Sequence, residues 1–183
     1  MSNVIILGSS RDNGNTAGLA NHLATTINAE IVNLNNYRIL PYDYAHKNQE
    51  DDFSGLIDHL ITYKRLIFAS PIYWYSPSAT MKLFIDRLCD LTEIDKTRGR
   101  NLRLKSAAVI STGAAVEVDS CFEQIFRKTF DYFSIKYDGM LYCQCEDDYV
   151  KTHHNKAVDL FATQFRSGND MRDVESRMML ENN

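Results

Sequence analysis

Hydrophobic positions along the chain follow two alternating patterns. Short runs of consecutive apolar residues, as at 4–7, are typical of buried strands, and apolar residues spaced three or four apart are typical of amphipathic helices. The first pattern predicts strands at 4–7, 30–34, 66–69, 107–110 and 135–143, and the second predicts helices at 16–28, 51–64, 77–91, 118–133 and 151–165. Buried strands that alternate with helices favour a parallel sheet covered on both faces. We therefore expect a doubly wound α/β domain around a five-stranded parallel sheet.

Length, charge and targeting signals narrow the class of protein. The chain has 183 residues, of which 44% are hydrophobic, and this is enough for one sizeable core. Its 24 acidic and 20 basic residues give a formal net charge of −4, without a block of like charge that would favour nucleic acid. The chain shows no signal-peptide pattern and no apolar stretch of membrane-spanning length. These features predict a single cytoplasmic domain without a nucleic-acid or membrane partner.

Nine small or polar residues, GSSRDNGNT at 8–16, join the first predicted strand to the first predicted helix. In a doubly wound sheet this loop lines the crevice where ligands bind. Side-chain donors, a glycine that allows close backbone approach and the unpaired amides of a helix N-terminus together predict a phosphate-binding loop. The alternative is an ordinary Asn-Gly turn with Asn15 as the helix cap. The spacing matches neither the P-loop nor G-x-G-x-x-G.

Three consecutive aromatic residues at 73–75 follow the third predicted strand, where a loop is ordinarily polar. Ser76 can cap the next helix, with Pro77 at its first position. Aromatic rings at the ligand end of the sheet can line a flat cofactor, or they can pack in a subunit interface. A third loop, STGAAVE at 111–117, places further small residues at the same edge. Together the three loops predict one binding site.

The motifs GSSRDNGNT, SPIYWYSPSATMKLFIDRL and STGA, in this order and at these separations, resemble those of the flavodoxin-like NAD(P)H-dependent FMN reductases and multimeric flavodoxins. The similarity covers most of residues 3–145. It implies a flavodoxin-like fold, bound FMN and NAD(P)H as co-substrate. Some relatives hold an iron–sulfur centre on cysteines after the second strand. This chain has no cysteine between Met1 and Leu88, so a cluster at that place is excluded.

The resemblance also implies which residues bind the cofactor. The first loop would hold the FMN phosphate, the second would lie along the isoalloxazine ring, and the third would contact the edge of the ring. The residues are Ser9, Arg11, Gly14, Asn15 and Thr16 in the first loop, Pro71, Ile72, Tyr73 and Trp74 in the second, and Ser111, Thr112, Gly113 and Ala114 in the third. Hydride transfer to flavin needs no acid–base residue, and we expect no catalytic side chain.

The favoured function is an FMN-dependent NAD(P)H oxidoreductase of the FMN-reductase or quinone-reductase type, which passes hydride through flavin to a quinone, another flavin or a metal ion. The alternative is a flavodoxin-type electron carrier without its own NAD(P)H activity. Carriers tend to be more acidic, and the loop at 35–50 offers aromatic residues to cover a substrate site. A response-regulator switch is disfavoured, because Gly8-Ser9 and Ser70-Pro71 stand where its aspartates would be.

The predicted helix at 118–133 suggests an assembly. It carries more large apolar side chains than one face of a sheet needs, and relatives bind flavin near a subunit boundary, so we expect a homodimer or homotetramer. The residues concerned are Phe122, Ile125, Phe126, Phe130 and Phe133.

The remaining expectations concern the other candidate sites and the C-terminal segment. The stretch at 143–154, CQCEDDYVKTHH, fits no standard metal site, and no metal is expected. The histidines His22, His46 and His59 are isolated and expected at the surface. We expect an FMN-binding domain at 1–167 and a polar tail at 168–183.

Overall fold

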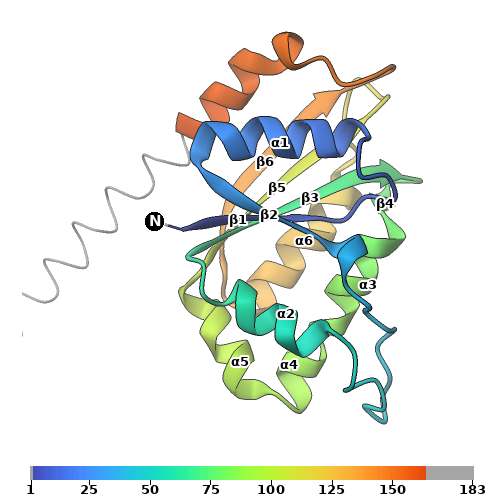
Figure 1. The fold of residues 1–183 in the computed structure, drawn as a ribbon, viewed down its shortest axis with the longest axis vertical. Coiled ribbons are helices and arrows are strands. Elements are labelled where there is room, and N and C mark those ends of the chain that lie inside the picture. The colour runs from blue at the N-terminus through green and yellow to red at the C-terminus, as the bar shows by residue number, and fades with distance from the viewer. Residues whose placement is uncertain (1, 164–183) are drawn as a thin grey trace, which may run out of the picture.

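Five parallel strands form the central sheet of the computed structural model, which describes residues 2–163 (Figure 1). The strands lie in the order β2-β1-β3-β5-β6. Their bounds are β1 Asn3–Leu7, β2 Ala29–Asn33, β3 Arg65–Tyr73, β5 Ser106–Gly113 and β6 Lys136–Gln144. The predicted doubly wound, five-stranded parallel sheet is confirmed. The expected domain boundary at residue 167 and the tail at 168–183 lie outside the described residues.

Helices cover both faces of this sheet. One face carries α1 (Asn15–Ile27) and a helix at 151–163, which is orange-red in Figure 1. The opposite face carries the other helices (Figure 1). They are α2 (Phe53–Leu60), α3 (Ala79–Arg87), α4 (Asp90–Glu93), α5 (Lys96–Asn101) and α6 (Ser120–Tyr132), with single turns of 3₁₀ helix at η1 (Leu34–Asn36) and η2 (Leu102–Leu104).

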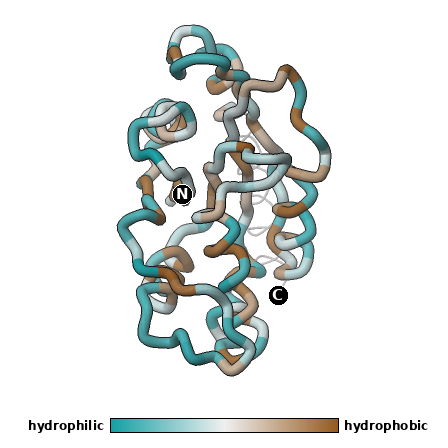
Figure 2. The backbone as a smooth tube through the Cα atoms, turned by 90° about the vertical axis from the view of Figure 1, so that its right-hand side faces the viewer, coloured by the Kyte–Doolittle hydropathy of each residue, from teal (hydrophilic) through white to brown (hydrophobic). Residues whose placement is uncertain are grey.

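The core on the second face is rich in phenylalanine, and this corrects the argument for a surplus of apolar surface on α6. Phe122, Phe126 and Phe130 are at most 1% exposed, and the ring centroid of Phe130 lies 5.0 Å from that of Phe68 on β3. Phe133 is buried too. The sheet thus covers much of the apolar stripe of α6 within one chain. In Figure 2 the teal, hydrophilic stretches lie largely along the outer loops and turns.

The connection from β3 to α3 differs from the expected one. β3 runs on through Pro71 to Tyr73 and turns back as a two-residue strand, β4 (Ser76–Pro77), which pairs antiparallel with it. Pro77 therefore lies in a strand and not in the first turn of a helix. Ser78, not Ser76, caps α3, because its Oγ accepts the Met81 amide at 3.1 Å. The helix predicted at 77–91 is two helices, α3 and α4.

The long loop between η1 and α2 is held by a buried arginine. Arg87 of α3 forms ion pairs with Asp51 and Asp90, and its guanidinium also donates to the carbonyls of Leu40 and Asn48, each at 3.0 Å. The loop aromatics Tyr42 and Tyr44 border a separate groove against α3, α4 and α6. No residue of the loop at 35–50 lines the hollows at the carboxyl ends of the strands, and its role as a cover for a substrate site stays a prediction.

One irregularity interrupts the pairing of β5 with β6. Ala107 pairs with Tyr137 and Val109 pairs with Met140, so β6 contains one more residue than β5 across this interval. Gly139 lies within it at a φ of 111°, a value that side-chain-bearing residues rarely adopt. The extra residue is a β-bulge.

None of the helices within residues 2–163 is both long enough and apolar enough to cross a membrane.

Candidate functional site

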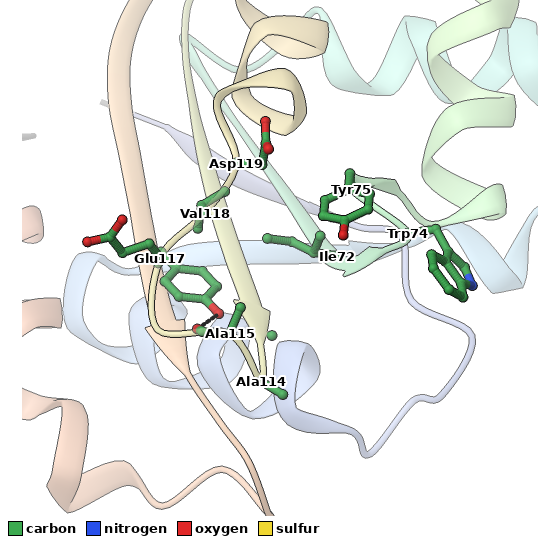
Figure 3. A pocket seen from close by; sticks show the side chains of 10 residues that line it. Ile72, Trp74, Tyr75, Ala114, Ala115, Glu117, Val118 and Asp119 are labelled. Carbon is green, nitrogen blue, oxygen red and sulfur yellow. Dashed lines mark hydrogen bonds between the residues drawn. The ribbon is translucent and has the colours of Figure 1, made fainter.

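Two adjoining hollows lie beyond the carboxyl ends of β1, β3 and β5. The smaller, about 170 Å³, is lined by Ser9, Arg11, Gly14, Asn15, Thr16, Pro71, Ile72, Tyr73, Thr112, Gly113 and Ala114. The larger, about 480 Å³, is lined by Ile72, Trp74, Tyr75, Gly113, Ala114, Ala115, Glu117, Val118, Asp119 and Tyr142 (Figure 3). Ile72, Gly113 and Ala114 line both hollows, so the two adjoin along these residues. The structure thus brings together all the predicted site residues except Ser111.

The N-terminus of α1 opens into the smaller hollow. Its N-cap residue, Gly14, supplies no side-chain hydrogen bond, and the first turn of α1 contains no acidic residue. The amides of this turn therefore keep their partial positive charge for a ligand. The Arg11 side chain lies over Gly14, with Nε 3.2 Å from the position that a Cβ would take there. Since Gly14 is the cap, the alternative of an Asn15-capped turn is not what the structure shows. This arrangement fits a phosphate group.

Buried hydroxyl groups fix the loop against the sheet. The Thr16 hydroxyl lies 2.8 Å from the Thr112 hydroxyl, and both residues are buried. Ser78 Oγ donates to the Gly8 carbonyl at 2.6 Å, which connects the loop to the start of α3. Ser111 is fully buried and donates to the Ser70 carbonyl at 2.7 Å. Ser111 thus holds β5 to β3 and does not line either hollow.

The side chain of Asn15 has partners on a different loop. Its Nδ2 donates to the Asp147 carbonyl at 2.7 Å, and its Oδ1 accepts the Tyr149 amide at 3.0 Å. Both partners lie in the turn between β6 and the helix at 151–163. Asn15 therefore borders the smaller hollow while its oxygen and one amide hydrogen are committed to this turn.

The turn between β3 and β4 consists of two aromatic residues in the left-handed region, Trp74 at a φ of 47° and Tyr75 at 63°. Two-residue hairpin turns with positive φ at both positions are ordinarily Asn-Gly or Gly-Gly. A side chain with a Cβ costs about 1–2 kcal/mol in this region. Trp74 is 91% exposed, and Figure 3 shows its indole at the outer rim, directed away from Ile72. Tyr75 lies beside Ile72 in the same view.

Sequence reasoning did not identify Val118, Asp119 and Tyr142 on the far wall of the larger hollow, and it included Glu117 only as the last residue of the third loop. The Tyr142 hydroxyl donates to the Ala115 carbonyl at 2.6 Å, and burial raises the pKa of this phenol. The Asp119 carboxylate caps α6 by accepting the Cys121 amide, and this bond lowers the pKa of Asp119. The position of the cap shows that the third loop extends to residue 119. Tyr142 could have been found from its place at the carboxyl end of the last predicted strand.

The site offers groups that bind and orient a ligand. Among the described residues that line the two hollows there is no histidine, lysine or cysteine. Within residues 2–163 no group of three or more histidine, cysteine or acidic residues is placed to hold a metal ion. His22 is buried, against the expectation of a surface residue, and lies outside both hollows. The described lining thus suits the binding of an anionic group beside a flat ring.

A family model described as NADPH-dependent FMN reductase matches residues 1–137 of the chain. Among curated proteins, YwqN of Bacillus subtilis (strain 168), which carries the provisional name NAD(P)H-dependent FMN-containing oxidoreductase, is 38% identical over 89 residues. This match covers 45% of the chain and 49% of YwqN, so the chain spans about half the length of this curated relative.

Solved structures share the fold. The Trp repressor binding protein from Bacillus subtilis superposes with a TM-score of 0.70 at 24% identity, and the match covers 88% of this chain and 96% of that chain. An FMN-dependent NADH-azoreductase from Bacillus anthracis, in complex with FMN, has a TM-score of 0.65 at 11% identity, with 91% of this chain and 99% of that chain covered. These likenesses confirm the flavodoxin-like fold. Because the family model matches well over half of its residues, the chain belongs to the NADPH-dependent FMN reductase family.

Proposed function

We propose that the protein binds FMN across the two hollows and uses it to transfer hydride from NADH or NADPH to a small acceptor. One observation carries this proposal. The N-terminus of α1, with Arg11 beside it, opens into the smaller hollow, and this hollow adjoins a larger one lined by aromatic side chains. When bound, FMN supplies a ring that accepts two electrons and passes them on. FMN and NADPH are the molecules in the name of the family to which the chain belongs.

The smaller hollow would hold the phosphate. Arg11 would provide a forked, charged donor, and the backbone amides at Gly14 to Thr16 would point at the same group. Ser9 and the Thr16–Thr112 hydroxyl pair would border it. FAD is disfavoured as the cofactor, because its second nucleotide half would need another such site.

The shared border of the hollows would hold the flavin ring. Pro71 and Ile72 would lie along the ring, and Gly113 and Ala114 would contact its edge through the backbone. Tyr73 lines the smaller hollow, and its hydroxyl lies 3.3 Å from Ser10 Oγ on the first loop. The chain's part in the reaction is then to orient the ring and to keep one ring face accessible.

The nicotinamide and the acceptor would meet the flavin from the larger hollow. Tyr75 and Trp74 stand at its outer wall and offer surfaces on which a planar molecule can stack. These walls favour a planar acceptor, such as a quinone or a second flavin, over a hydrated metal ion. The exchange of electrons would take place beside the β3–β4 turn.

The exposed aromatic residues around this site also support a homodimer or homotetramer. Tyr73, Trp74 and Tyr75 are 46%, 91% and 60% exposed, and Val116 on the facing loop is 78% exposed. A second copy that covered these side chains would complete the wall of the flavin site. Light scattering at micromolar concentration should then give a particle larger than the 21.0 kDa chain, and a 21.0 kDa particle would contradict this assembly.

The cofactor and the reaction can be tested in sequence. Chromatography of the released chromophore should identify FMN, and a protein that neither contains nor takes up FMN would contradict the whole proposal. Under anaerobic conditions, NADH or NADPH should then bleach the bound flavin without any partner protein. A flavodoxin-type carrier would stay yellow under this treatment and accept electrons only from a separate reductase.

A further inference from the structure

The turn at 145–150 is attached to the first turn of α1 through one side chain. Asn15 bonds with both its donor and its acceptor to the backbone of this turn, at Asp147 and Tyr149. The same residue follows the Gly14 N-cap, whose neighbouring amides face the smaller hollow. Asn15 thus links the backbone of the turn to the first turn of α1.

The ring of Tyr149 strengthens this attachment on the next turn of α1. It lies directly over Gly18, where a Cβ would come within 2.8 Å of the ring carbon Cδ1. The Tyr149 hydroxyl lies 2.7 Å from Nδ1 of His22, one turn further along the helix. On its other side the ring stacks on His154, with centroids 4.9 Å apart and an interplanar angle of 16°. Tyr149 is therefore packed between α1 and the helix at 151–163.

We propose that Asn15 and Tyr149 are positioning residues for the FMN phosphate, and that the turn at 145–150 acts as a brace for the N-terminus of α1. This inference rests on the proposed function, since it concerns how the same hollow is kept in shape. It departs from the expectation that Asn15 is itself a phosphate donor. In the brace, Asn15 affects FMN binding by holding the backbone amides of α1 in place. Residues far from the phosphate that support the same amides should therefore also affect FMN binding.

Three variants separate a brace from a direct donor. Asn15→Ala removes both bonds to the turn, Gly18→Ala pushes the Tyr149 ring away from α1, and Tyr149→Leu removes the ring without adding bulk. Asn21→Ala is the matched control, because within residues 2–163 the Asn21 side chain bonds to the Ala17 carbonyl of its own helix and to no residue of the turn. Circular dichroism and thermal unfolding would establish that each variant folds.

The first measurement is the affinity for FMN, followed by flavin fluorescence. Asn15→Ala, Gly18→Ala and Tyr149→Leu should each weaken FMN binding about tenfold. The double variant Asn15→Ala/Gly18→Ala should be no weaker than Asn15→Ala, because both changes break one coupled unit. Asn21→Ala should leave the affinity unchanged. If only Asn15→Ala weakens FMN binding, the brace is overturned and Asn15 is a direct donor to the phosphate. Fully additive losses in the double variant would also overturn the brace.

The second measurement is hydrogen exchange of the flavin-free protein, which does not depend on FMN binding. Asn15→Ala and Tyr149→Leu should both accelerate exchange of the Gly18 amide, which donates to the Gly14 carbonyl at 2.9 Å, and Asn15→Ala should also accelerate exchange of the Tyr149 amide. Unchanged exchange of the Gly18 amide in both variants would overturn the brace. If the wild-type protein binds no FMN, the proposed function fails, while this experiment still decides whether the brace exists.

Discussion

Arg11 is the cationic side chain among the described residues that line the smaller hollow. A hydrogen bond to a charged group contributes about 1.5–3 kcal/mol, so Arg11→Ala should weaken FMN binding roughly tenfold to a hundredfold. Riboflavin, which lacks the phosphate, should bind to the variant as it does to the wild type. Arg11→Lys keeps the charge but not the forked pair of donors, so its FMN affinity should lie between that of Arg11→Ala and that of the wild type. Equal losses for FMN and riboflavin in a fluorescence titration would place Arg11 away from the phosphate.

The pair of buried hydroxyls at Thr16 and Thr112 makes a prediction about stability. Thr112→Val keeps the shape of the side chain and leaves the Thr16 hydroxyl buried without this partner. An unsatisfied buried polar group costs about 1–3 kcal/mol, and the free energy of unfolding in urea should fall by that amount. Thr112→Ser retains the hydroxyl and is the control. A Thr112→Val protein as stable as wild type would mean that the Thr16 hydroxyl finds another acceptor.

At the scale of elements, the turn of the β3–β4 hairpin consists of two residues whose side chains disfavour the left-handed backbone that they adopt. Replacing Trp74-Tyr75 with Asn-Gly should relieve about 1–2 kcal/mol per residue. For a chain of this size, thermal unfolding should shift upward by about 2–4 °C for each kcal/mol. Oxidation of NADH or NADPH should become slower in the same variant if the two rings form the stacking wall. A lower unfolding temperature would show that contacts of the two rings outweigh the backbone strain.

The start of α3 offers a second prediction at this scale. Ser78 accepts the Met81 amide and donates to the Gly8 carbonyl, and it is 2% exposed. Ser78→Ala removes the cap and leaves the Gly8 carbonyl without this donor, so unfolding should become easier by roughly 1–3 kcal/mol. Ser76→Ala, at the exposed serine that the sequence favoured as the cap, is the matched control and should be nearly neutral. Equal effects in urea unfolding would contradict the assignment of Ser78.

At the scale of the whole molecule, the two histidines that contact Tyr149 make stability depend on pH. Burial lowers the pKa of both His22 and His154 below the usual value of 6.5. The unfolded chain therefore takes up these protons at a higher pH than the folded chain does. Stability should be intact above about pH 6.5 and should fall as the pH drops through the lowered folded pKa values. His22→Gln should flatten this decline in urea unfolding series, and an unchanged slope would exclude His22 as a source.

Much of the architecture could be predicted from periodicity, because consecutive apolar residues such as those of β1 leave few alternatives to a buried parallel strand. The candidate site was predictable to the extent that it lies in the loops after β1, β3 and β5. Asn15 was not predictable in detail, since its partners are backbone atoms more than 130 positions away. The tight turn at Trp74-Tyr75 was not predictable either, because aromatic residues rarely adopt the left-handed backbone conformation.

The bulge at Gly139 determines which side chains of β6 face the site. Side chains of a strand alternate between the two faces, so one extra residue exchanges the faces for everything that follows. With the bulge, Leu141 and Cys143 pack in the core beside α1, while Tyr142 reaches the larger hollow. A chain of the same sequence without Gly139 would present Leu141 and Cys143 to the ligand and bury the Tyr142 hydroxyl against α1. The one extra residue at the bulge therefore determines whether the far wall of the site carries the phenol of Tyr142 or the thiol of Cys143.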